Sequence, residues 1–147
     1  MPTSSKARYD SLFRHYNDDG KIDWRYMKAQ AMAESAMNPR AKSHVGARGL
    51  TQFMPATWGE VMRETPFADP ENPEDAIKAQ ALYMRRLLGM FDGDLEKATA
   101  AYNWGPGRVA RAVAKHGDEW FAHTPVETKQ YVPRIEGLYQ QYLKEDV

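Results

Sequence analysis

The sequence predicts an all-α domain. Three observations lead to this prediction: apolar residues recur at steps of three and four, Asn, Asp and Pro stand where helices would begin, and Gly or Pro stands where they would end. No stretch alternates apolar and polar residues long enough to indicate a sheet. We therefore expect about six or seven helices in a single domain spanning residues 1–147.

The first predicted helix begins at Trp24, with Asp23 as its N-cap. It carries one continuous stripe at steps of three and four, made of Trp24, Met27, Ala31 and Glu34. We expect Asn38-Pro39 to end it, because a residue before proline avoids the α region. A short helix follows around residues 58–62, closed by Pro66.

Two further helices begin at clear caps. Asn72 precedes Pro73, and acidic residues follow in the first turn, where the helix dipole favours negative charge. Asp94 caps the next helix, which continues to Tyr102. The apolar stripes of these two helices are Ile77, Ala81, Met84 and Leu88, and then Ala98 and Ala101.

The last two predicted helices complete the chain. Gly117 ends the first of them, and Thr124-Pro125 opens the second. Pro133 falls within the early turns of that final helix or kinks it. Their apolar positions are Val109 and Val113, followed by Ile135, Leu138, Tyr139 and Tyr142.

Composition excludes several classes of function. The 147 residues contain twenty basic and twenty acidic side chains and no cysteine. The balanced charge argues against a broad electrostatic contact with nucleic acid or an anionic membrane. Without cysteine there is no disulfide, thiolate nucleophile or Cys-ligated zinc. No apolar run reaches the ~20 residues of a membrane span, and the N-terminus shows no apolar signal region. We expect a monomer that binds no nucleic acid and does not insert into membranes.

Glu34 is the strongest candidate for chemistry. It lies among small and apolar residues, in the run AMAESAM, on the stripe that contains Trp24 and Met27. Partial burial there would raise the pKa of the carboxyl group, and a protonated carboxyl is what a general acid requires. Periodicity alone favours the other interpretation, in which Glu34 lies one step round the helix in water.

Two segments downstream add to this candidate site. GARGLTQFMP combines two glycines with Gln52 and Met54, and AYNWGPGRV places Tyr102, Asn103 and Trp104 before a Gly-Pro-Gly turn. Glycine lets the backbone approach a ligand closely. Amides beside aromatic rings suit sugars, since the amide bonds hydroxyl or acetamido groups. Taken singly, each segment is also explained as a plain loop or as core aromatics next to a turn.

Together these segments resemble the soluble lytic transglycosylase domain, the goose-lysozyme-like branch of the lysozyme superfamily. The resemblance covers residues 8–143 and rests on four motifs in order: ESAMNPRAKS, GARGLTQFMP, AYNWG and ETKQYV. It implies a lysozyme-like helical domain with an active-site cleft. One departure is Thr51, where the family usually has methionine, and this change would reshape a pocket wall.

The resemblance also implies roles for individual residues. Glu34 would be the single catalytic acid and later the base. Tyr102 would orient Glu34 or the reacting sugar. The remaining substrate-binding residues would be Ser43 and Gln52 at the N-acetyl group or backbone of the muramic acid, Met54 beside that sugar, Asn103 close by, and Glu127 and Tyr131 at the cleft floor.

The activity implied is cleavage of the MurNAc–GlcNAc β-1,4 bond of peptidoglycan glycan strands, with formation of 1,6-anhydro-MurNAc and without a metal or other cofactor. A muramidase on the same fold, in which Glu34 helps water attack, and a non-catalytic cell-wall-binding module remain alternatives. A catalytic domain without a signal or anchor suits a bacteriophage lysis enzyme or virion component. A periplasmic bacterial enzyme lacking its leader is the other expectation.

Three other patterns are weaker. The run from His15 to Tyr26 resembles an EF-hand loop, but both end positions lack a carboxylate, so we expect a turn leading to the Asp23 cap. The four histidines show no metal-ligand spacing. Arg108, Arg111 and Lys115 share one helix face, which we interpret as solvated, with acidic stem peptides of the wall as the alternative.

Overall fold

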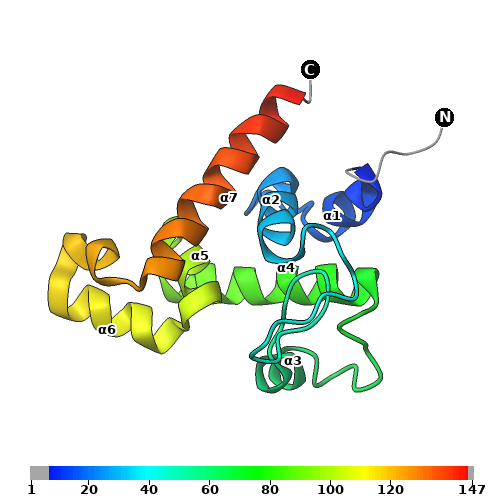
Figure 1. Ribbon diagram of the computed structural model, residues 1–147, viewed down its shortest axis with the longest axis horizontal. Helices are drawn as coiled ribbons and strands as arrows, with labels where there is room; N and C mark the ends of the chain where they lie inside the picture. Colours follow the sequence, from blue (N-terminus) through cyan, green and yellow to red (C-terminus); the bar gives the residue numbers. More distant parts are fainter. Residues whose placement is uncertain (1–6, 146–147) are drawn as a thin grey trace.

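The computed structural model describes residues 7–145, which form helices joined by loops (Figure 1). Within this range no sheet forms, and two isolated β-bridges join Arg48 to Lys42 and to Phe53. The all-α prediction is therefore confirmed. The α-helices are α1 (Asp10–Tyr16), α2 (Trp24–Ser35), α3 (Pro55–Val61), α4 (Pro73–Met90), α5 (Leu95–Trp104), α6 (Pro106–His116) and α7 (Val126–Glu145), and the 3₁₀-helix η2 (Gly117–His123) precedes α7.

Helices α2, α4, α5 and α7 enclose the main core. In Figure 1, α4 runs through the middle of the molecule, α7 rises away from it, and α6 with η2 lies at one end. Helix α7 packs on α2 and α5, and α4 packs on α5 and α1. The side chains at the centre are fully buried and come from three helices: Met27, Ile77, Met84, Leu87 and Ile135. A smaller apolar cluster under α3 contains Phe53, Met62 and Ala79.

The predicted caps form as expected. The Asp23 carboxylate accepts a hydrogen bond from the Arg25 N–H at 2.9 Å. The Asn72 side chain accepts one from Asp75 N–H at 3.0 Å, and the Asp94 carboxylate accepts one from Lys97 N–H at 3.1 Å. Each bond satisfies a backbone donor that the first helical turn leaves unpaired.

The structure corrects two boundaries of the predicted helices. Helix α2 ends at Ser35, three residues before Asn38. Ala36 and Met37 adopt left-handed backbone angles, with φ of 53° and 64°, which stop the helix before the proline acts. Helix α7 begins at Val126, one residue after Pro125, and Pro133 lies inside it.

Two elements were not predicted. Helix α1 has only seven residues and buries only Phe13 completely, so its sequence shows no repeating apolar stripe. The 3₁₀-helix η2 places Trp120 in the core. None of the helices in residues 7–145 is long and apolar enough to cross a membrane.

Candidate active site

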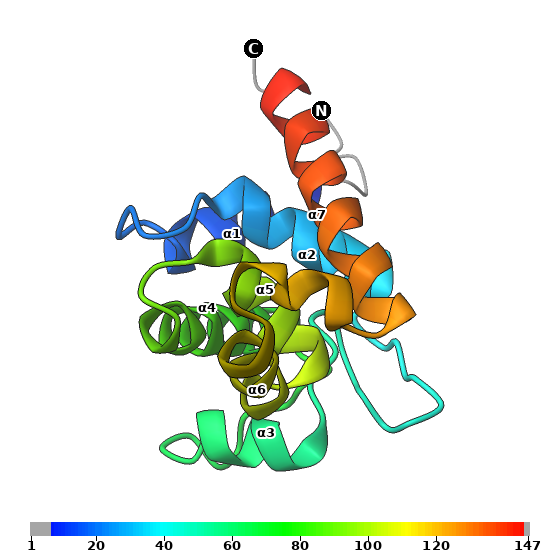
Figure 2. The same cartoon turned by 90° about the vertical axis from the view of Figure 1, so that its left-hand side faces the viewer.

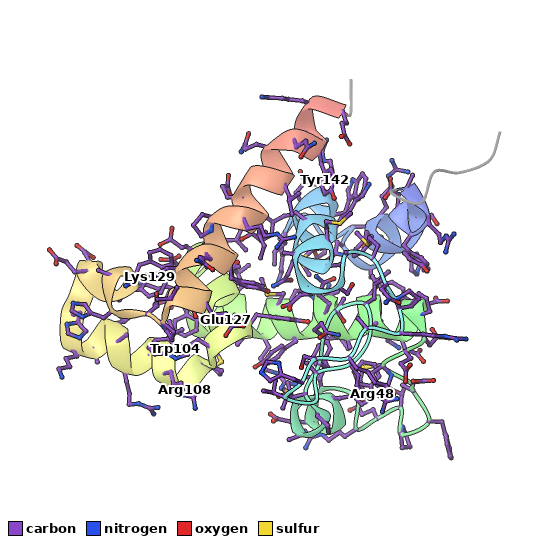
Figure 3. The ribbon with its side chains drawn as sticks, viewed as in Figure 1. Arg48, Trp104, Arg108, Glu127, Lys129 and Tyr142 are labelled. Atoms are coloured by element: carbon purple, nitrogen blue, oxygen red, sulfur yellow. The ribbon has the colours of Figure 1, made fainter. Side chains whose placement is uncertain are left out.

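A cleft of about 470 Å³ lies between α2, the start of α7, the end of α5 and the loop that joins α2 to α3. In Figure 2 this loop extends beside the start of α7. Figure 3 shows Glu127 at the start of α7 and Arg48 in the loop region. The cleft brings together the candidate residues that the sequence analysis selected, which are Glu34, Ser43, Gln52, Met54, Tyr102, Asn103, Glu127 and Tyr131.

Glu34 lies in the last turn of α2 and is partly buried in the wall of the cleft. Burial raises the pKa of its carboxyl group from 4.5 to about 8. A hydrogen bond from the Tyr131 hydroxyl lowers the pKa and opposes this effect, and the negative charge of Glu127 raises it further. At pH 7 the protonated form therefore exceeds the ionised form by about tenfold. The interpretation that placed Glu34 in open water is wrong, because the start of α7 covers this turn of α2.

Tyr131, on α7, holds the Glu34 side chain. Its hydroxyl donates to Oε2 of Glu34 at 2.7 Å. The sequence analysis expected Tyr102 to orient Glu34 or the reacting sugar. The Tyr102 hydroxyl donates to the carbonyl of Thr51 at 2.7 Å and not to Glu34, so only the role at the sugar stays a prediction. Tyr102 thus bonds the loop directly. Burial and the negative charge of Glu34 raise the pKa of both tyrosines well above 10.

The loop opposite α7 is fixed by backbone geometry. Gly49 has φ of +87°, and a Cβ atom there would lie 1.8 Å from the carbonyl oxygen of Pro70. Only glycine fits this close approach. The Ser35 hydroxyl, which follows Glu34 in the chain, donates to the Leu50 carbonyl at 2.7 Å. Arg48 forms an ion pair with Glu71 on the other side of the loop. The loop is therefore attached directly beside the Glu34 carboxyl group.

Two polar side chains of the loop use part of their hydrogen-bonding capacity internally. The Gln52 amide nitrogen donates to the carbonyls of Ala41 and Gly49, at 3.0 and 2.9 Å. The Ser43 hydroxyl oxygen accepts from Ala47 N–H at 3.0 Å. Gln52 therefore presents its carbonyl oxygen to the cleft as an acceptor, while Ser43 keeps its hydroxyl proton for a ligand.

The remaining candidates lie at the two ends of the cleft. The Asn103 side-chain oxygen accepts from the Thr128 hydroxyl at 2.8 Å, which leaves the amide N–H₂ as the donor on the cleft side. Glu127 is exposed at the start of α7, and Met54 is 42% exposed where α3 begins. Thr51 does not itself line the cleft: it is buried, and its hydroxyl donates to the Ala76 carbonyl of α4 at 3.0 Å. Whether the change from methionine reshapes the wall stays a prediction.

Sequence reasoning missed several residues that line the cleft. They are Ala33, His44, Val45, Ala47, Gln130 and Arg134. For Gln130 and Arg134 a signal existed, because Gln130 lies three residues after Glu127 and Arg134 lies three residues after Tyr131, on one face of α7. The two core glutamines behind Tyr131, Gln30 and Gln80, were also missed.

The weaker patterns of the sequence have the following places in the structure. Among residues 7–145, no group of three or more His, Asp or Glu side chains could hold a metal ion. The segment between α1 and α2 forms turns and bends that lead to the Asp23 cap. Arg108, Arg111 and Lys115 are exposed and line a shallow pocket with Trp104, next to the stacked rings of His116 and His123. Figure 3 shows Arg108 and Trp104 on this side of the molecule.

The fold and the cleft define a helical domain built around one protonated carboxyl group. The chain belongs to the family of the transglycosylase SLT domain, whose model matches residues 11–124. Peptidoglycan transglycosylase gp16 of Escherichia phage T7 is 40% identical over 104 residues, covering 69% of this chain and 8% of that protein.

Solved structures of lytic transglycosylases share the fold. The 70-kDa soluble lytic transglycosylase of Escherichia coli superposes with a TM-score of 0.82 at 30% identity, covering 93% of this chain and 25% of that one. An inactive Glu-to-Gln mutant of the lytic transglycosylase Slt from Pseudomonas aeruginosa superposes with a TM-score of 0.83 at 29% identity, covering 94% and 25%. The chain thus spans about a quarter or less of each of these relatives.

Proposed function

We propose that this chain is a peptidoglycan lytic transglycosylase that cleaves the MurNAc–GlcNAc β-1,4 bond and forms 1,6-anhydro-MurNAc, with Glu34 as general acid and then general base. The observation that carries the proposal is the raised pKa of Glu34, about 8, in a cleft that contains the other motif residues. A carboxyl group in this range donates a proton at neutral pH and takes one back in the next step.

The relatives support the proposal. One is a peptidoglycan transglycosylase of a phage, and in another, a lytic transglycosylase, a Glu-to-Gln change gives an inactive enzyme. Membership of the SLT family adds to this support. Since the chain spans about a quarter or less of these proteins, the activity of the domain by itself has to be measured directly.

In the first step, the protonated Glu34 carboxyl donates its proton to the glycosidic oxygen. The oxygen of the 2-acetamido group of MurNAc attacks C1, and the bond from C1 to the leaving GlcNAc oxygen breaks. The acetamido group serves as the nucleophile that a second carboxylate supplies in most glycosidases. Because this nucleophile belongs to the substrate, its proximity lowers the entropic part of the barrier.

In the second step, the Glu34 carboxylate accepts the proton of the C6 hydroxyl of the same sugar. The C6 oxygen attacks C1 and releases the acetamido oxygen, which closes the 1,6-anhydro ring. Glu34 is protonated again, and no water is consumed. We propose that the Gln52 carbonyl oxygen accepts from the acetamido N–H and that the Asn103 amide donates to a sugar oxygen. Ser43, Met54 and Tyr102 complete the wall around that sugar.

A hydrolytic muramidase is a second candidate because Glu127 places another carboxylate in the same cleft. As a base, Glu127 would activate a water molecule for attack on C1, in the manner of two-carboxylate glycosidases. The products then differ: hydrolysis leaves a reducing MurNAc end, whereas the transglycosylase reaction leaves an anhydro ring that is lighter by one water.

Mass spectrometry of purified peptidoglycan after digestion tests these alternatives. We expect anhydro products from the wild type, and a loss of activity of about 10²–10⁴-fold in Glu34→Gln with the fold intact by circular dichroism. Glu127→Gln is the matched control, and it should keep anhydro products. Reducing ends that disappear in Glu127→Gln would favour the muramidase, and binding to the wall without any released fragment would favour a non-catalytic module.

We further propose that residues 1–147 form one domain that acts on cell-wall glycan strands as a monomer. A phage lysis enzyme, a virion component and a periplasmic bacterial enzyme all agree with this activity. The phage relative supports the phage settings, and the murein transglycosylases of Escherichia coli among the relatives support the bacterial one. Sedimentation of the purified chain measures the oligomeric state.

A further inference from the structure

Two glutamines lie in the centre of the hydrophobic core, where apolar residues would be expected. Gln30 on α2 and Gln80 on α4 are both fully buried, among Met27, Ile77 and Met84. The Gln80 side-chain oxygen has no hydrogen-bond partner within residues 7–145. An unpaired buried oxygen lowers the stability of a fold. The two glutamines therefore lower the free energy of unfolding relative to a pair of leucines. Packing alone does not explain why they occupy the core.

The two glutamines form a hydrogen-bonded chain that ends at Glu34. The Gln80 nitrogen donates to the Met27 carbonyl at 3.0 Å and to the Gln30 side-chain oxygen at 2.8 Å. The Gln30 nitrogen donates to the Tyr131 hydroxyl at 3.0 Å. The Tyr131 hydroxyl donates to Oε2 of Glu34 at 2.7 Å.

The hydrogen bonds from Gln80 through Gln30 and Tyr131 to Glu34 can run in only one direction, from donor to acceptor. A backbone carbonyl can only accept, so the Met27 carbonyl requires the nitrogen of Gln80 on its side. The second hydrogen of that nitrogen then faces Gln30, which must present its oxygen. Gln30 consequently presents its nitrogen to Tyr131, and the tyrosine oxygen accepts. The single hydroxyl proton of Tyr131 is left to point at Glu34.

We propose that Gln30 and Gln80 are positioning residues that hold the Tyr131 proton on Oε2 of Glu34 and so keep the acidic proton of Glu34 on Oε1. If the Glu34 proton moved to Oε2, the Tyr131 hydroxyl would have to donate to a carboxyl O–H oxygen, which is a weaker acceptor than a carbonyl oxygen. Within the described residues Tyr131 donates to no other acceptor. No described residue donates to or accepts from Oε1, which is therefore the oxygen open to a ligand. Under the proposed function this ligand is the glycosidic oxygen, and the inference rests on the proposed function in that one respect.

The groups around Glu34 determine what the loss of this chain would do. On α7, Tyr131 bonds the carboxyl group, Glu127 acts on it by its charge, and Arg134 lines the same cleft. On α5, Tyr102 lines the cleft close enough for the charge of Glu34 to act on it. The loop adds His44 to the same cleft. Of the groups that act on the pKa of Glu34, the Tyr131 hydrogen bond lowers it, while burial and the charge of Glu127 raise it. When Tyr131 is free to rotate, the ionised form loses its donor and the pKa of Glu34 rises.

The test is the double variant Gln30→Leu/Gln80→Leu, which removes both amides together and leaves neither one unpaired. We expect it to fold. The pKa of Glu34, followed by the ¹³C shift of its labelled carboxyl group, should rise by about 0.5–1 unit. The basic limb of the pH profile for peptidoglycan cleavage should move with it, and kcat on its plateau should fall by about threefold to tenfold. Thr99→Val is the matched control, since it removes a buried hydroxyl that bonds Tyr26 rather than Tyr131.

A double-mutant cycle with Tyr131→Phe decides whether the glutamines act through the tyrosine. Tyr131→Phe alone should raise the pKa of Glu34, and adding the glutamine changes to it should cause no further shift. An unchanged pKa in either variant, or the same shift with and without Tyr131, overturns the proposal. The carboxyl titration needs no substrate. If the protein did not cleave peptidoglycan but its variants showed these shifts in the pKa of Glu34, the proposed function would be contradicted. The positioning role of the glutamines would still be established.

Discussion

The two walls of the cleft are built on opposite principles. In the wall formed by α2 and α7, polar groups lie against the core, and burial raises the pKa of Glu34 to about 8. In the wall formed by the loop after α2, polar side chains bond backbone groups of the loop itself: Gln52 bonds Ala41 and Gly49, and Ser43 bonds Ala47. The helical wall thus carries a carboxyl group that is costly to ionise, whereas the hydrogen bonds of the loop wall fix the backbone conformation of the loop.

The two walls therefore have different roles: the helical wall sets the protonation state of Glu34, and the loop wall sets the shape of the cleft. A carboxyl group can be kept protonated only where water is partly removed, and the packing of two helices achieves that. A loop close to a ligand needs satisfied backbone groups, since it has no helical ladder of its own. We therefore expect substitutions in the loop wall to reduce stability, and removal of the acid from the helical wall to increase it.

The largest effect should come from Gly49→Ala in the loop wall. The added Cβ would meet the Pro70 carbonyl oxygen at 1.8 Å, and the φ of +87° is unfavourable for alanine. We expect a loss of about 3–4 kcal/mol in the free energy of unfolding, measured by urea denaturation, together with most of the activity. Gly46→Ala is the control, because its φ of +101° is also positive but no atom lies within 4 Å. Equal losses in both variants would show that backbone strain alone, without the contact, fixes this wall.

The second prediction concerns Glu34→Gln and stability. The folded pKa of about 8 lies above the ordinary value of 4.5 for a free carboxyl group, so the folded protein binds more protons than the unfolded chain between these values. Glu34 therefore destabilises the wild type progressively as the pH rises from about 4.5 to about 8. At pH 6.5 the variant should be more stable by about 2–3 kcal/mol, and the part of the difference that comes from ionisation of Glu34 should vanish near pH 4.

Thermal unfolding of both proteins across this pH range measures the effect. A stability difference that does not depend on pH would mean that the Glu34 carboxyl group ionises as freely in the fold as in the unfolded chain. The helical wall would then have no special role in its chemistry.

The smallest effect is expected for Ser35→Ala. In the wild type, the Ser35 side chain joins the helical wall to the loop wall. The variant loses the hydroxyl donor to the Leu50 carbonyl and should lose about 1–2 kcal/mol of stability. Cleavage activity should fall even under conditions where the variant stays fully folded, because the loop would move relative to Glu34. Ser11→Ala on the exposed surface of α1 is the control, with unchanged unfolding and cleavage. If Ser35→Ala behaved like Ser11→Ala in both assays, the two walls would be positioned independently.

Much of the fold could be predicted, because local signals were strong. Asp23, Asn72 and Asp94 cap their helices with their own side chains, so a few neighbouring residues contain the information. The end of α2 could not be predicted in this way. It depends on left-handed angles at Ala36 and Met37, next to a contact between Ser35 and Leu50, fifteen positions apart.

The cleft was predictable as a set of residues but not as an arrangement. The motifs supplied Glu34, Gln52, Asn103 and Tyr131, and the structure collects them in one cleft. Their partners were not apparent: Tyr102 holds Thr51 and not Glu34, and Asn103 bonds Thr128. These pairs join different elements, and no periodicity within one helix contains them.

The sequence by itself determined the helical class, the starts of α2, α4 and α5 and the candidate for the acid, since caps, apolar stripes and short motifs act over a few neighbouring residues. Only the tertiary structure decided that this acid stays protonated, which tyrosine holds it and that two core glutamines stand behind that tyrosine. Burial and hydrogen-bond direction are properties of groups brought together from α2, α4 and α7, and they exist only once those helices pack.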